Sequence, residues 1–230
     1  MTRLEYIASL TSERVIADVG SDHGFLIKIL FDDGKIDYAY AIDISQKCVE
    51  KARRNLSKYN SKITFLCGDG LEPLENVLQV NLEQKQPNIV PKQAFIAGMG
   101  GREIKSILSQ KASQKIDKYV IAPQRDVVEL RQYLIDNFFT ILIDKVVKEG
   151  KMFYNVLCVQ RVVSSGQVKQ SLTQSQLLFG LSNIESMDSD FIEYAKFQLS
   201  MWGDILSKKE VPGIRAKYNL LKSLVKDNID

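Results

Sequence analysis

The chain has 230 residues, of which 45% are hydrophobic and 26% are charged, and its formal net charge at pH 7 is +3. This composition indicates a soluble globular protein. With no apolar run long enough to cross a bilayer and no apolar leader at the N-terminus, we expect a cytoplasmic protein without a membrane partner. Three scattered cysteines exclude a disulfide scaffold and lack metal-ligand spacing, so we expect no metal, and the weak positive charge permits a nucleic-acid partner without requiring one.

The first predicted strand, residues 15–19, follows a short amphipathic helix over 2–10 and leads into a distinctive turn. Asp18 is a carboxylate within this apolar strand, and Gly20-Ser21-Asp22-His23-Gly24 follows before a helix begins at Phe25. Such a turn directs backbone N–H groups at a ligand. The middle glycine of a dinucleotide fingerprint is absent, and the acids favour the ammonium and sulfonium groups of S-adenosylmethionine over a pyrophosphate. The alternative is a strand and a capped helix without a ligand.

The second and third predicted strands end in acids at corresponding places. Residues 38–42 form the second strand, and Asp43 follows where nucleotide-binding folds place a carboxylate on the ribose hydroxyls. Asp43 could also be the N-cap of the predicted helix over 45–57, and the two roles could coexist. Residues 63–66 form the third strand, and Gly68-Asp69-Gly70 after it would let the backbone approach a flat ligand while the acid accepts a hydrogen bond. Alone, this tripeptide is also ordinary turn chemistry.

Two further strands are expected over residues 94–97 and 119–122, after a less regular segment over 74–90. Gly98-Met99-Gly100-Gly101 leaves the tip of the first of them without side-chain bulk. That indicates close approach by a cofactor or a flipped base, or else tight helix packing. The second is followed by Pro123-Gln124-Arg125.

A helix over 127–137 and two β-rich runs, residues 140–147 and 153–162, complete the first part of the chain. The short connection between the two runs predicts a hairpin. By analogy with known folds, the strands together predict an α/β protein with a Rossmann-like class I methyltransferase fold. Its seven-stranded sheet would be mostly parallel, with an antiparallel hairpin at one end.

A stretch rich in Ser, Gln and Thr over 164–176 predicts a boundary between a methyltransferase domain, residues 1–163, and a helical domain, residues 164–230. Apolar residues at steps of three and four predict an antiparallel coiled-coil hairpin over 188–228. These positions are Ile192, Ala195, Leu199, Trp202 and Leu206, then Ile214, Tyr218, Leu221 and Val225. The hairpin would cover the sheet, form a dimer, or lie along a large substrate.

Four motifs occur in order along the chain: Asp18-Val19-Gly20-Ser21-Asp22-His23, Gly68-Asp69-Gly70-Leu71, Ile96-Ala97-Gly98-Met99-Gly100-Gly101 and Ala122-Pro123-Gln124. Together they resemble the bacterial TrmK family of tRNA (adenine-22-N1)-methyltransferases, which use S-adenosylmethionine. The resemblance covers nearly the whole chain, including the C-terminal hairpin. The family commonly has Ala-Tyr where this chain has Gly24-Phe25, and Asn where it has Gln124.

The resemblance implies a role for each matching residue. The cofactor-binding set would be Asp18, Gly20, Asp22, His23, Asp43, Ile44, Gly68, Asp69, Gly70, Ala97, Gly98 and Met99. Within it, Asp43 would hold the ribose and Asp69 the adenine amino group, while residues 97–99 border the methyl group. The catalytic set would be Asp22, His23, Phe25 and Gln124, with Phe25 stacking on the base. For His23, a ring packed within the turn is the alternative.

The implied reaction is methyl transfer to N1 of an adenine in tRNA by a monomeric enzyme. N1 carries a lone pair and no proton, so alignment of the reacting atoms would supply most of the catalysis. The Asn/Asp-Pro-Pro-Tyr/Phe motif of amino-group methylating enzymes is absent after the fourth strand, which favours a ring nitrogen. The alternatives are a small-molecule methyltransferase with the same fold and a non-catalytic RNA-binding protein with a degenerate cofactor pocket.

Overall fold

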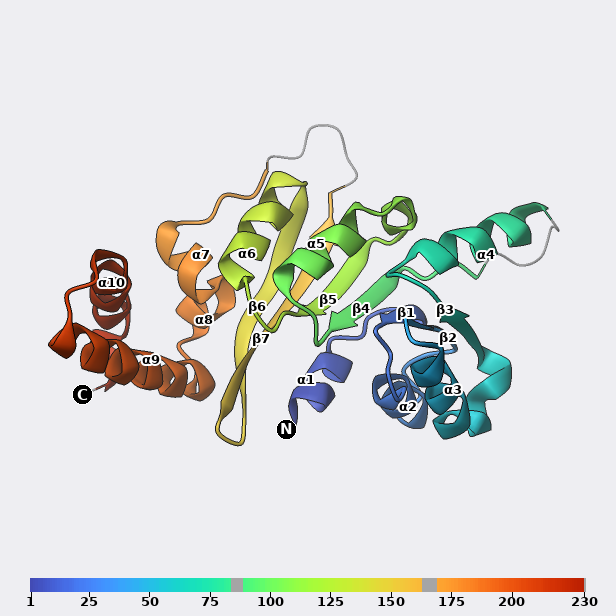
Figure 1. Cartoon of the computed structure of the whole chain (residues 1–230), viewed down its shortest axis with the longest axis horizontal. Coiled ribbons are helices and arrows are strands. Elements are labelled where there is room, and N and C mark those ends of the chain that lie inside the picture. Colours follow the sequence, from blue (N-terminus) through green and yellow to red (C-terminus); the bar gives the residue numbers. More distant parts are fainter. Residues whose placement is uncertain (84–88, 163–168, 230) are drawn as a thin grey trace.

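The strands occur along the chain where the sequence predicts them. The computed structural model describes residues 1–83, 89–162 and 169–229. Its strands are β1 (Val15–Val19), β2 (Tyr38–Asp43), β3 (Ile63–Cys67), β4 (Gln93–Ala97), β5 (Lys118–Ala122), β6 (Phe139–Glu149) and β7 (Met152–Arg161). They form one seven-stranded sheet in the order β3-β2-β1-β4-β5-β7-β6 (Figure 1). The first five pair in parallel, and β7 runs antiparallel between β5 and β6, so the expected Rossmann-like fold is confirmed.

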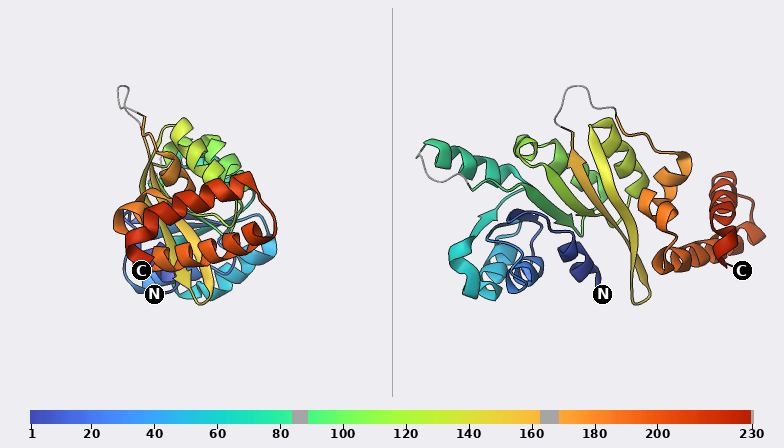
Figure 2. Two further views of the ribbon diagram at one scale, coloured as in Figure 1. Left: turned by 90° about the vertical axis from the view of Figure 1, so that its left-hand side faces the viewer. Right: turned by 180° about the vertical axis from the view of Figure 1, so that it is seen from behind.

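Helices cover both faces of this sheet. Those of the first part of the chain are α1 (Arg3–Ser9), α2 (Phe25–Asp32), α3 (Gln46–Asn55), α4 (Glu72–Glu83), α5 (Gly101–Ser109) and α6 (Val127–Asp136). The first three bury their apolar side chains on one face, and the last three on the other (Figure 2). Because side chains alternate along a strand, Ile16 of β1 faces the first group and Ala17 the second. Asp18, two residues after Ile16, therefore lies on the side of α1 and α2.

The prediction of an irregular segment over 74–90 was wrong for its first half. Helix α4 begins at Glu72, and Leu74 and Leu78 lie one helical turn apart and are fully buried against the sheet. Leu71, just before the helix, joins the same cluster. Val77 packs against the same cluster, so the steps of three and four between Leu74, Val77 and Leu78 were a helical signal in the sequence. Residues 84–88 of the segment lie outside the described part of the chain.

The C-terminal part is helical, as expected. It contains α7 (Gln174–Phe179), α8 (Leu181–Ser186), α9 (Ser189–Lys208) and α10 (Pro212–Ile229). Helices α9 and α10 pack as a hairpin around Ala195, Leu221 and Val225 of the predicted apolar positions. Phe179 of α7 and Phe191 of α9 complete this third cluster. Among the described helices, none is long and apolar enough to cross a membrane.

Side chains of the C-terminal part bind the outer edge of β6, the last strand of the sheet. The N–H groups of Asp144, Val146 and Lys148 alternate along this edge. They donate to Ser182 Oγ at 3.0 Å, Asn183 Oδ1 at 2.8 Å and Asp190 Oδ2 at 3.0 Å, respectively. An edge strand otherwise presents unpaired donors to other chains. Covering the sheet, one of the roles considered for the C-terminal helices, is therefore a role they have.

A buried ion pair within the first part of the chain also contacts the C-terminal part. The guanidinium of Arg131 on α6 donates to both oxygens of Asp144 on β6, at 2.7 and 2.8 Å. Its remaining donors reach the carbonyl oxygens of Leu177 and Leu178 on α7, at 3.0 and 3.3 Å, and Asn155 Oδ1 at 3.2 Å. Both charged side chains are 0% exposed. Helix α7 thus accepts hydrogen bonds that the interior of the first domain would otherwise leave unmade.

Candidate active site

Two cavities open where the parallel strands end, and they meet at Gly20. The larger, which we call the β2–β3 cavity, encloses about 340 Å3. It is lined by Val19, Gly20, Ile42, Asp43, Ile44, Gly68, Asp69, Gly70, Met99, Glu103, Ser106 and Ile107. The second, the α1 cavity, encloses about 250 Å3. It is lined by Arg3, Leu4, Ile7, Asp18, Gly20, Ser21, Asp22, His23, Phe25, Leu26, Ala97, Gly98 and Glu149.

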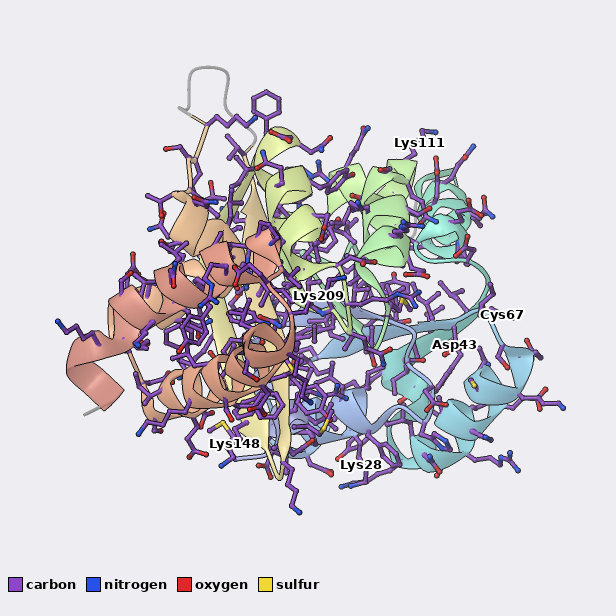
Figure 3. The ribbon with its side chains drawn as sticks, turned by 60° about the vertical axis from the view of Figure 1, so that its left-hand side comes forward. Lys28, Asp43, Cys67, Lys111, Lys148 and Lys209 are labelled. Atoms are coloured by element: carbon purple, nitrogen blue, oxygen red, sulfur yellow. The ribbon has the colours of Figure 1, made fainter. Side chains whose placement is uncertain are left out.

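Asp43 is held in place before any ligand arrives. One carboxylate oxygen accepts a hydrogen bond from the N–H of Asp22 at 3.0 Å, and the other from the N–H of Ser45 at 2.8 Å. Ser45 is the N-cap residue of α3, so Asp43 is not itself the cap, although it accepts from the N–H of the capping residue. Each oxygen retains acceptor capacity toward the cavity. Asp43 and Cys67 lie side by side at the ends of β2 and β3 (Figure 3).

The glycine turn after β3 is fixed by α5 and the residues that follow it. The side chain of Gln110 accepts from the N–H of Leu71 at 2.6 Å and donates to the carbonyl oxygen of Asp69 at 3.3 Å. Gly70 has φ +55°, and a Cβ there would lie 2.6 Å from Gln110 Oε1. The side chain of Asp69 remains exposed at the cavity. The turn therefore brings backbone close to the ligand space and leaves one carboxylate free to accept.

The turn after β1 forms the boundary between the two cavities. Gly20 has φ +75°, and a Cβ on it would lie 2.5 Å from Cε of Met99. Asp22 also has a positive φ, of 44°, which is uncommon for a residue with a side chain. Its N–H bond to Asp43 holds this conformation. The left-handed backbone at position 20 favours glycine, and the end of the Met99 side chain fills the space that a Cβ would take.

Asp18 is a buried carboxylate facing the α1 cavity. It is 6% exposed, and within the described residues no group donates a hydrogen bond to it. Burial, together with the nearby charge of Asp43, raises the pKa of Asp18 to about 7. A carboxyl group in this state gains most when a cation approaches, because the cation offsets the cost of ionising it.

Two aromatic rings border the α1 cavity, and one glutamine lies behind its wall. The rings of His23 and Phe25 stack at 5.4 Å, and His23 Nε2 lies 3.5 Å from Asp22 Oδ1. Phe25 is 55% exposed, so its ring has a free face. Gln124 does not line either cavity, but its N–H donates to the carbonyl of Met99 at 2.9 Å. The structure thus brings every predicted site residue to this edge of the sheet, with Gln124 one position behind the cavity wall.

The glycines after β4 have separate roles. A Cβ on Gly100 would lie 2.4 Å from Glu103 Oε2, and one on Gly101 would lie 2.8 Å from the carbonyl of Asp126. These two glycines allow α5 to pack closely. Gly98 differs, because the nearest atom to a Cβ there is Gln124 Nε2 at 3.9 Å, and the residue lines the α1 cavity. Open space at Gly98 is what a site for an incoming group requires.

Several lining residues were not predicted from the sequence. They are Arg3, Leu4 and Ile7 of α1, Glu149 of β6, and Glu103, Ser106 and Ile107 of α5. The amphipathic pattern of α1 predicted a helix but not its position beside the site. Glu103 forms an ion pair with Arg125 at 3.0 Å across the turns that follow β4 and β5. In the described residues, no cluster of three or more His, Cys, Asp or Glu could hold a metal ion.

Comparisons with known proteins agree with this geometry. A family model described as a methyltransferase domain matches residues 1–157. The tRNA (adenine(22)-N(1))-methyltransferase of Bacillus subtilis is 27% identical over 164 residues, which cover 69% of this chain and 63% of that protein. A relative from Mycoplasma pneumoniae is 28% identical over 193 residues, covering 83% and 84% of the two chains.

Among solved structures, Streptococcus pneumoniae Sp1610 in complex with S-adenosyl-L-methionine superposes with a TM-score of 0.81. It is 25% identical, and the match covers 98% of this chain and 100% of the other. The TrmK of M. capricolum, in complex with S-adenosyl-homocysteine, has the same fold, with a TM-score of 0.80 and 24% identity. That match covers 98% of this chain and 97% of the other, so the likeness extends through the C-terminal helices.

Proposed function

Because this chain belongs to the methyltransferase-domain family, we propose that it transfers the methyl group of S-adenosylmethionine to N1 of adenine 22 in tRNA. The expected membership of the TrmK family is confirmed by its relatives. One observation carries the assignment to this site: two cavities at the carboxyl ends of the strands meet at Gly20. We assign the adenosine part of the cofactor to the β2–β3 cavity and its methionine part to the side of the α1 cavity next to Gly20. The acceptor base is assigned to the mouth of the α1 cavity.

The cofactor is held by acids whose surroundings suit its charges. Asp43 accepts from the ribose hydroxyls, and Asp69 from the adenine amino group, beside Gly68, Gly70 and Ile44. Asp18 faces the ammonium group of the methionine part, with Gly20 and residues 22–23 on the same side. The unpartnered Asp18 fits a cationic ligand, since a positive charge would favour its ionised form. S-adenosylmethionine, when bound, supplies a methyl group on a positively charged sulfur.

The acceptor base is positioned by the rim of the α1 cavity. Phe25 presents an exposed ring on which a base stacks, and Gly98 leaves room for its edge. Asp22 and His23 lie beside it as polar contacts, and Gln124 supports the wall from behind through Met99. N1 of adenine lies on the pairing edge, so the base must leave its pair to enter. The chain's contribution is alignment, because N1 needs no deprotonation before it attacks.

The tail has a second role in this proposal. Residues 1–163 form the methyltransferase domain and residues 164–230 a helical domain that contacts tRNA. Lys208, Lys209, Arg215 and Lys217, at and near the turn between α9 and α10, are its candidate phosphate contacts. We propose that the enzyme acts as a monomer in the cytoplasm, where its tRNA substrate is found.

Turnover with isotopically labelled cofactor and bulk tRNA tests this function. The label should enter tRNA, and nucleotide mapping should place it on N1 of adenine 22. Label in a small molecule would identify a different methyltransferase. Binding of tRNA without any turnover would identify a non-catalytic RNA-binding protein.

Asp43→Ala should weaken binding of S-adenosylmethionine by about 1–3 kcal/mol, the scale of lost hydrogen bonds to a charged group. Calorimetric titration measures this directly. Asp37→Ala is the matched control, because Asp37 lies at the other end of β2 and pairs with Arg14. Equal affinity in both variants and the wild type would refute the ribose assignment.

Affinity for S-adenosylmethionine should fall as pH is lowered from about 7.5 to about 5.5, by up to about tenfold per pH unit below the pKa of Asp18. The cofactor's α-amino group stays protonated over this range, whereas Asp18, whose pKa is about 7, must release a proton to face it. Without ligand the sign is reversed: because the folded pKa is raised, the stability that protonated Asp18 contributes is lost as pH rises toward 7.

Calorimetry at several pH values, in buffers of different ionisation enthalpy, measures both the affinity and the proton release. Asp18→Asn should flatten the profile. His23→Gln is the control for the nearby imidazole and should retain it. A flat profile in the wild type would exclude Asp18 as the ammonium partner.

A further inference from the structure

We propose that Arg3 holds a backbone phosphate of the nucleotide whose base occupies the α1 cavity. This inference rests on the proposed function, and it assigns a substrate-positioning role to a helix that the sequence presents only as a lead-in. Helix α1 forms one wall of the cavity through Arg3, Leu4 and Ile7. The helix lies beside the turn between β6 and β7 in both views (Figures 1 and 2).

Acidic side chains outnumber basic ones in the lining of the α1 cavity, which disfavours binding of a phosphate. Asp18, Asp22 and Glu149 contribute carboxylates to the wall. Arg3 is the only Lys or Arg among the described residues that line this cavity. A polynucleotide presents a phosphate on each side of the base that it inserts. Without Arg3, the Asp and Glu side chains of the lining would have no Lys or Arg beside them to offset their repulsion of those phosphates.

Arg3 is fixed at two points. Its backbone N–H donates to Glu149 Oε1 at 3.0 Å, which ties the start of α1 to the end of β6. Its guanidinium lies over the ring of Tyr154 on β7, 4.4 Å from the centroid. In the described residues, no carboxylate lies within ion-pair distance of this guanidinium. The charge is therefore held in place but not neutralised.

A guanidinium stacked on a ring is well suited to bind phosphate. The ring occupies one face of the group, while the N–H donors at its edge stay available for a planar, bidentate contact. The ring also limits the rotamers of the side chain, so less entropy is lost when the phosphate binds. These properties suit the phosphates of an RNA backbone, and they would not help to bind a substrate without phosphate.

Binding of an unmodified tRNA transcript by the full-length protein, measured across a series of salt concentrations, tests the proposal. Arg3→Ala should lower affinity at low salt by about tenfold, and the slope of log affinity against log salt should shrink by about 1. Arg3→Lys keeps the charge and should retain most of the slope. Arg14→Ala is the matched control, since Arg14 precedes β1 at the opposite end of the sheet. Affinity for S-adenosylmethionine should stay within about twofold of wild type in all variants.

A wild-type slope in Arg3→Ala would overturn the proposal. So would a parallel loss of affinity for S-adenosylmethionine, because that outcome indicates a structural role for the contact with Tyr154. Arg3→Gln, which keeps the polar side chain, decides the matter if the alanine variant unfolds. The binding measurement needs no turnover. If the wild-type protein bound tRNA without methylating it, the proposed function would be wrong. The role of Arg3 would still be decided by how the affinity of each variant for tRNA depends on salt.

Discussion

Replacing Gly98 with valine should reduce methyl transfer to tRNA by at least about a hundredfold, the scale on which a misplaced reacting group lowers a rate. Gly98 has φ +80°, a backbone conformation that a β-branched residue strongly disfavours. Its N–H donates to the carbonyl of Ala122 at 3.2 Å, which ties the residue to β5. The new methyl groups would take up open space beside the α1 cavity, which Gly98 lines and which the acceptor base must approach.

Gly34→Val separates the two causes of such a loss. Gly34 has φ +65° and open space around it, but it lies in the turn before β2, away from the site. It should therefore suffer comparable backbone strain while turnover stays near wild type. Calorimetry should show that Gly98→Val still binds S-adenosylmethionine within about tenfold of wild type. Turnover near the wild-type rate in Gly98→Val would show that this glycine, like Gly100 and Gly101, serves packing.

Arg131→Ala should lower the free energy of unfolding by about 3–5 kcal/mol, because it leaves the buried charge of Asp144 without a partner. For a chain of this length that corresponds to a fall in melting temperature of about 6–20 °C. The loss extends beyond the ion pair, since the carbonyl oxygens of Leu177 and Leu178 also lose their donor. Thermal unfolding followed by calorimetry measures the change.

Two further variants test the cause. Arg131→Met combined with Asp144→Leu removes both charges, so it should recover much of the stability lost in the single variant. Arg215→Ala breaks an exposed pair with Glu210, which solvent screens, so it should leave the melting temperature close to that of the wild type. If Arg131→Ala proved no more harmful than Arg215→Ala, the buried pair would not be what joins the C-terminal helices to the first domain.

The parts of the structure that the sequence predicts well are those specified by local signals. Strands β1 to β5 are short apolar runs, and each ends in a turn marked by glycine, proline or an acid. In a parallel sheet, strand ends meet at one edge, so Asp43 and Asp69 could be brought together by topology alone. The signal that predicts the helical hairpin is equally local, since its apolar positions recur at regular steps.

Contacts between distant segments could not be predicted in this way. The bond from Arg3 to Glu149 joins residues 146 positions apart, and nothing in either sequence neighbourhood indicates the other. Arg131 is another case, because an arginine on an amphipathic helix usually points to solvent. Its burial depends on Asp144 and on α7, a helix beyond the predicted domain boundary. Buried groups of α6 and β6 therefore bind α7 and α8 across the two predicted domains.

The pairing of the β6 edge with later side chains has a consequence for protein synthesis. Strands β6 and β7 are complete once Arg161 has been made, but the β6 edge is closed by later residues. Gln170 binds Ile141, and residues from Ser182 to Asp190 bind Asp144, Val146 and Lys148. At about 5–20 residues per second, ribosomes leave the edge open for about 1–6 s. Neighbouring nascent copies on one messenger can pair through it in that interval. Codon choice over residues 162–190 should therefore control how much of this protein is recovered in soluble form.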